Sequence, residues 1–123
     1  MSNVRFQYLY RDGSNYKRWG DIVFSNPDDR SVESILKSLG KSFSNDGLFI
    51  AHQVRIPEVF LAGEYMLSED DHCFHEFSGV EVTPDAPSDP YGRSIGEFVT
   101  EVANEAERGW SVFDPIERLS RLD

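Results

Sequence analysis

The stretch VRFQYLY at residues 4–10 alternates between two sets of side chains, one of which is large and apolar or aromatic. That set is Val4, Phe6, Tyr8 and Tyr10. Because successive side chains of a β-strand point to opposite faces, this period of two predicts a strand with one apolar face. Turn-forming residues follow at 12–15, and an apolar run resumes at 17–25, so we expect an N-terminal hairpin with a loop longer than two residues.

Two further segments have the apolar periodicity of amphipathic helices. Residues 31–43 begin with Ser31, which can cap a helix, and residues 94–108 begin with a capping box of Ser94 and Glu97. The first apolar stripe is Val32, Ile35, Leu36, Leu39 and Phe43, and the second is Ile95, Phe98, Val99, Val102, Ala103 and Ala106. Each stripe is expected to pack on a core.

The remaining segments are less regular. Residues 48–61 are apolar and favour a strand, although Pro57 prevents a long central strand and a helix is the alternative. Residues 72–83 alternate well enough for another strand, interrupted at 78–79 (Ser-Gly) by a bulge or turn. Residues 84–93 contain three prolines and a glycine, so we expect an irregular loop, and such loops often carry function.

The order strand, strand, helix, strand, strand, helix predicts the fold class. It indicates an α+β fold with an antiparallel or mixed sheet of about four strands and two main helices on one face. The length of 123 residues fits a single domain spanning residues 1–123. Asp114 and Pro115 can cap and open a short helix near the C-terminus.

Composition limits the classes of partner and compartment. The net charge is −10, and residues 57–107 carry Arg93 alone against thirteen acids. An acidic chain repels phosphate backbones and anionic lipids, so neither nucleic acid nor a membrane is an expected partner. The chain has a single cysteine, Cys73, which cannot form an internal disulfide, and its first twenty residues hold no apolar run of the signal-peptide kind. A cytoplasmic protein is therefore expected.

The N-terminal hairpin mixes basic and aromatic side chains. They include Arg5, Phe6, Tyr8, Tyr10, Arg11, Tyr16, Lys17, Arg18 and Trp19. Stacking platforms for single-stranded nucleic acid have this composition, but so does an amphipathic hairpin with aromatic side chains inward and basic ones outward. The acidic total favours the hairpin.

A cluster of metal-binding and acid–base side chains lies at residues 70–76. Its candidate catalytic residues are Asp71, His72, His75 and Glu76, with Arg11 as a further candidate. In a strand, residues at odd spacing point to opposite faces, so His72 and His75 are expected to be separated. Cys73 and His75 would share a face but lack an evident third ligand. We therefore expect no metal and no cofactor, with a small enzyme or metal-assisted hydrolase as the alternative.

The outer face of the second predicted helix carries a repeat of acidic residues. Glu97, Glu101 and Glu105 recur every four residues, where like charges repel slightly. A solvated helix face accounts for this stripe, and the alternative is a face that binds a basic protein partner. The preferred function is a non-catalytic binding domain for a protein or small-molecule partner, with a homodimer as one possible form.

Several short motifs carry a resemblance to a known family. They are YLYRD at 8–12, NYK at 15–17, WG at 19–20, VFSNP at 23–27, IP at 56–57 and DDHCFHEF at 70–77. The pattern resembles a family of uncharacterised bacterial proteins associated with mobile genetic elements, including integron gene cassettes. The resemblance implies a bacterial cytoplasmic setting and no inherited site residue. It also suggests that residues 11–12 and 72–76 lie together in a polar pocket at one end of the sheet.

Overall fold

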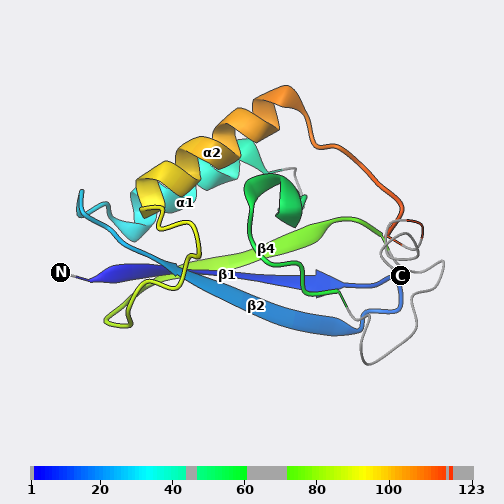
Figure 1. Cartoon of the computed structure of the whole chain (residues 1–123), viewed down its shortest axis with the longest axis horizontal. Coiled ribbons are helices and arrows are strands. Elements are labelled where there is room, and N and C mark those ends of the chain that lie inside the picture. Colours follow the sequence, from blue (N-terminus) through cyan, green and yellow to red (C-terminus); the bar gives the residue numbers. More distant parts are fainter. Residues whose placement is uncertain (1, 44–46, 61–71, 116, 118–123) are drawn as a thin grey trace.

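The computed structural model describes residues 2–43, 47–60, 72–115 and 117 of the chain. Within these residues, an antiparallel sheet has the strand order β2-β1-β4-β3, and two helices lie side by side over one of its faces (Figure 1). The elements are β1 (Asn3–Arg11), β2 (Lys17–Phe24), α1 (Val32–Ser42), β3 (Leu48–Phe49), β4 (His75–Thr83) and α2 (Ile95–Arg108). The α+β class predicted from the sequence is confirmed.

The alternating side chains of β1 form the centre of the core. All four are at most 1% exposed: Val4, Phe6, Tyr8 and Tyr10. Phe6 packs edge-on against Phe98 of α2, with 5.1 Å between ring centroids, and Ile35 and Leu39 of α1 belong to the same cluster. The period of two in the first strand therefore predicts the buried face correctly.

Both predicted helices are confirmed, including their caps. The Ser31 hydroxyl accepts the N–H of Ser34 at 3.1 Å and begins α1. At the start of α2, the Ser94 hydroxyl accepts the Glu97 N–H at 3.1 Å, while the Glu97 carboxylate accepts the Ser94 N–H at 3.0 Å. One detail of the stripes was wrong, because Leu36 is 41% exposed and Ala103 is also exposed.

The predicted irregularity at Ser78 is a β-bulge. Gln7 of β1 lies opposite Gly79, whereas its neighbour Tyr8 lies opposite Phe77. Ser78 is therefore the additional residue in β4, and it bends that strand where the sheet curls over the core.

The strand expected over residues 48–61 was wrong from residue 50 to residue 60, and residue 61 lies outside the described residues. A 3₁₀-helix, η1 (Ala51–Val54), follows β3, and Arg55 then adopts a left-handed conformation with φ 59° and ψ 43°. Four apolar side chains around this tight turn are buried without alternating: Ile50, Ala51, Val54 and Ile56. A 3₁₀ turn and a short strand have similar apolar content, so the sequence pattern does not separate them.

Loop 84–93 returns from the end of β4 to the start of α2 and crosses the edge of β2 (Figure 1). Ser88 and Asp89 donate their N–H groups to the carbonyl of Val23 at 2.9 and 3.3 Å. No helix in the described ranges combines the length and apolar character that a membrane crossing requires. Asp114 accepts the N–H of Glu117 at 3.4 Å, as a helix cap would, and Pro115 and Glu117 are helical, whereas residues 116 and 118–123 of that predicted helix lie outside the described residues.

Candidate functional site

The polar segments around Arg11 and His72 lie together, as the resemblance suggested. The Arg11 guanidinium contacts the Glu76 carboxylate at 3.3 Å, and His72 Nε2 lies 2.7 Å from the Arg11 carbonyl. Because a carbonyl only accepts, Nε2 carries the proton, and Nδ1 accepts the N–H of Phe74 at 3.1 Å. Both ring nitrogens of His72 therefore form hydrogen bonds with backbone groups. Asp71 falls outside the described residues.

His75 has a different environment from His72. Its side chain is fully buried on the core face of β4, where Nε2 accepts the N–H of Val59 at 2.9 Å. Tyr10 contacts both imidazoles, at 5.5 Å from the His75 ring and 5.2 Å from the His72 ring. Among the described residues, no three His, Cys, Asp or Glu side chains are grouped to hold one ion. Each of the four candidates Arg11, His72, His75 and Glu76 therefore bonds another part of the chain.

The glutamate stripe of α2 is less exposed and less negative than expected. Glu101 is 22% exposed and bonds both Arg55 and Arg93, while Glu105 is 18% exposed and contacts Arg108 at 3.3 Å. Glu97 is the exposed member, and one of its oxygens closes the capping box. The solvated face expected for this stripe is therefore fully exposed only at Glu97, and binding of a basic partner there stays a prediction.

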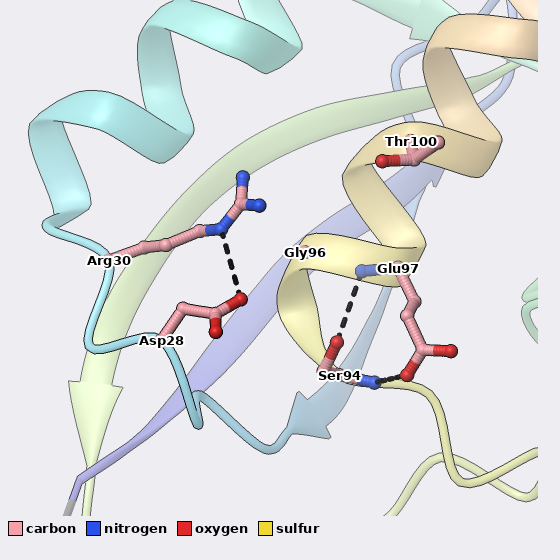
Figure 2. Close-up of a pocket in the computed structure, with 6 residues that line it drawn as sticks. All are labelled: Asp28, Arg30, Ser94, Gly96, Glu97 and Thr100. Carbon is pink, nitrogen blue, oxygen red and sulfur yellow. Dashed lines mark hydrogen bonds and ion pairs between the residues drawn. The ribbon is translucent and has the colours of Figure 1, made fainter.

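A cavity of about 360 Å³ opens between the segment before α1 and the first turns of α2 (Figure 2). Its lining residues are Asp28, Arg30, Ser94, Gly96, Glu97 and Thr100. The Arg30 guanidinium packs so closely on Gly96 that a Cβ there would lie 2.9 Å from its Nη2. Asp28 contacts Arg30 at 3.9 Å, and the Ser94–Glu97 box uses N–H groups at the start of α2. Asp28 and Arg30 therefore form an ion pair beside this cavity, and Glu97 is bonded to the backbone of Ser94.

The most constrained polar group of the described chain is the buried guanidinium of Arg93. Its side chain is 5% exposed, and that of its partner Asp89 is fully buried. Nε and Nη2 donate to the two Asp89 oxygens, both at 2.9 Å. Nη1 donates to the Val54 carbonyl and Glu101, and Nη2 donates to the Arg55 carbonyl, at 2.7, 3.2 and 2.9 Å. All five donors are used, so loop 84–93, η1 and α2 are fixed to one another.

Arg55 and Tyr91 stack on top of this network. The Arg55 guanidinium lies 4.5 Å from the centre of the Tyr91 ring, while Nε and Nη2 donate to the Glu101 carboxylate at 2.9 and 2.6 Å. The backbone of Arg55 is left-handed, which costs about 1 kcal/mol or more in a residue other than glycine. Such strain concentrates at functional sites. Tyr91 is nevertheless 58% exposed. The Tyr91 ring is therefore fixed by its contact with Arg55 and is exposed to solvent.

These residues border a shallow cavity of about 270 Å³ that we call the Arg55–Tyr91 patch. The patch consists of His52, Arg55, Ile56, Pro57, Pro90 and Tyr91. Its floor is apolar, since Ile56 is 4% exposed, and its one guanidinium is already paired with Glu101. The patch can therefore accept an apolar side chain beside an aromatic ring.

The ionisation of the network follows from its contacts. Hydrogen bonds from the Arg55 side chain lower the pKa of Glu101, against the opposing effect of burial. Burial alone would raise the pKa of Asp89, but hydrogen bonds from the Arg93 side chain and backbone outweigh it, so that pKa is also lowered. Both carboxylates are therefore charged at neutral pH.

The sequence did not identify the Arg55–Tyr91 patch. Two signals pointed toward it: the irregular loop at 84–93 and the isolation of Arg93 among acidic residues. Neither signal indicates that Arg93 reaches the carbonyls of Val54 and Arg55, which lie 39 and 38 residues away in the chain. Such a contact depends on the tertiary fold.

No protein-family model matches this chain, and comparisons with curated proteins and with solved structures gave no match. The resemblance to a family of uncharacterised bacterial proteins associated with mobile genetic elements therefore stays a prediction. The geometry of the Arg55–Tyr91 patch is consequently the basis for a functional proposal.

Proposed function

We propose that this chain is a non-catalytic binding domain that holds a protein partner through the Arg55–Tyr91 patch. The observation that carries the proposal is the 58% exposure of Tyr91 on a loop fixed by the buried Asp89–Arg93 pair. Tyrosine and arginine are enriched among the residues that dominate binding energy at protein interfaces. The partner is expected to place an apolar side chain in the shallow cavity.

Rigidity of the patch supports this proposal. Association is weakened when loops and side chains must be ordered at an interface, and a loop ordered beforehand avoids that cost. Here the Arg93 guanidinium bonds Asp89, which lies two residues before Tyr91. It also bonds the carbonyl of Arg55, whose side chain stacks on the Tyr91 ring. Tyr91 is therefore already positioned in the free protein.

The alternative of a small enzyme or metal-assisted hydrolase has no comparable support. General acid–base chemistry needs a titratable group within reach of a substrate. His75 is fully buried, and both nitrogens of His72 contact the backbone. The Arg11–Glu76 pair likewise satisfies its own charges.

A selection of displayed peptides tests the proposal. A random peptide library would be selected on the wild-type domain, and the dissociation constants of the enriched peptides would be measured against Tyr91→Ala. Removing a dominant aromatic contact costs more than about 1.4 kcal/mol, so we expect binding at least tenfold weaker. The peptides should share an apolar side chain at one position.

The matched control is Tyr16→Ala, since Tyr16 is 57% exposed on the hairpin loop rather than in the patch. Tyr16→Ala should leave the dissociation constants unchanged. If the enriched peptides bind Tyr91→Ala as tightly as wild type, the patch is not the binding site. Thermal unfolding of both variants verifies that the fold is intact.

A further inference from the structure

The edge of β2 is paired in one half, and the part of the chain that the structure describes leaves the other half unpaired. Near its C-terminal end, the Val23 N–H donates to the Ser88 hydroxyl at 2.9 Å, and the Val23 carbonyl accepts two N–H groups of loop 84–93. Ser25 forms a bridge with Ser94 just beyond. Among the described residues, no backbone group pairs with the outer edge between Lys17 and Asp21.

The hydrogen-bonding pattern shows which backbone groups face this open edge. Backbone groups of alternate residues in an edge strand point toward and away from the neighbouring strand. Val23 points away from β1, because its N–H and carbonyl bond loop 84–93. By the same alternation, the backbone N–H and carbonyl groups of Lys17, Trp19 and Asp21 point away from β1, toward the open edge. The Asp12 N–H bonds the Tyr16 carbonyl across the hairpin at 3.0 Å, which gives the same register independently.

The open segment is complementary to itself. In an antiparallel pair centred on Trp19, each Trp19 faces the Trp19 of the other copy, and each Lys17 faces an Asp21. Arg18 faces Gly20 in the same register, and the Arg18 guanidinium is already bonded to the Phe60 carbonyl of its own copy at 3.1 Å. A register centred on residue 20 would require Val23, whose backbone groups are already bonded. The register centred on Trp19 therefore uses all the open groups.

We propose that two copies of this chain associate through residues 17–21 of β2, in a twofold antiparallel pair centred on Trp19 that continues the sheet across both molecules. This surface is separate from the Arg55–Tyr91 patch. Each outward-facing pair exchanges two backbone hydrogen bonds. Trp19 is 61% exposed beside a cavity of about 320 Å³ lined by Gln7, Gly20 and Asp21 as well, which leaves space for the second indole.

Charge favours this location for contact between copies. Two chains with a net charge of −10 repel each other, so an interface is favoured where negative charge is locally low. Residues 1–40 carry six basic and five acidic side chains, whereas residues 57–107 carry one basic side chain against thirteen acids. A lysine on an edge strand commonly prevents pairing with another chain. In the proposed pair, Asp21 of the second copy faces Lys17 and would neutralise its charge.

A charge-swap experiment tests the pair. Sedimentation equilibrium on wild type should give twice the mass of one chain at high concentration and dissociation on dilution. Lys17→Asp places two carboxylates opposite each other at both ends of the pair and should raise the dimer dissociation constant about tenfold or more. The double variant Lys17→Asp with Asp21→Lys restores opposite charges and should restore the dimer. Asp21 also contacts Arg5 at 2.9 Å, so thermal unfolding of each variant serves as the fold control.

A cysteine substitution tests the register. The twofold axis brings residue 19 of each copy within disulfide distance, so Trp19→Cys should cross-link under mild oxidation. Tyr16→Cys, exposed but outside the pair, should not. A wild-type protein that is monomeric at all concentrations would overturn the proposal. So would a dimer that Lys17→Asp leaves unchanged, because it would use another surface.

Discussion

At the residue scale, Arg93 is the group on which the arrangement of the patch depends. It is the one basic residue in the stretch 57–107, and it is buried against Asp89 with all its donors used. A guanidinium in this position has no replacement among the other side chains, because lysine lacks the planar set of donors. Removing the Arg93 guanidinium should therefore lower the free energy of unfolding substantially.

Arg93→Ala is expected to destabilise the domain by about 3–5 kcal/mol, since it leaves the buried Asp89 carboxylate without its partner. Replacing both residues with apolar side chains, Asp89→Leu and Arg93→Met, should be less harmful than Arg93→Ala alone. Urea unfolding of the three proteins measures the difference. Equal losses for the single and double variants would show that the buried charge is not the cause.

At the element scale, local signals predicted the fold well, and contacts distant in sequence limited the prediction. The helix caps at Ser31 and Ser94 are local, because a hydroxyl bonds an N–H three residues later, and both were predicted correctly. The 3₁₀-helix η1 was not, because it ends at Arg55 in a left-handed conformation whose carbonyl accepts a hydrogen bond from Arg93. The site was missed for the same physical reason.

The two helices provide a prediction of their own. Val102→Asp should unfold the domain, because Val102 is fully buried and would place an unpaired charge in the core. Leu36→Asp should change stability by no more than about 1 kcal/mol, since Leu36 is 41% exposed. Circular dichroism melting curves distinguish the two. Equal loss of structure in both variants would contradict the observed packing of α1.

At the scale of the whole molecule, the ion-pair network joins parts of the chain that are distant in sequence. Arg93 and Glu101 connect η1, loop 84–93 and α2, and loop 84–93 also holds the edge of β2. Weakening this network should therefore loosen several elements together. Its two carboxylates make the stability of the domain sensitive to acid.

The pKa values of Glu101 and Asp89 are lowered in the folded protein, so the unfolded chain binds protons more readily at these groups. Their stabilising effect is therefore complete above the ordinary pKa values, near 4.5 and 3.8, and is lost as pH falls through the lower folded values. Urea midpoints should decline below about pH 4.5. Glu101→Gln should decline less steeply over the same range. An identical slope for both proteins would contradict this role.

Because Cys73 is buried, the reaction rate of its thiol can be used to measure local opening of the structure. The thiol is the only one in the chain and is 2% exposed, just ahead of β4. A thiol reagent can therefore react only when the segment around Cys73 opens, and the labelling rate reports how often that happens. The same protection leaves an introduced surface cysteine as the only reactive one, so probes can be attached at a chosen position without replacing the native residue.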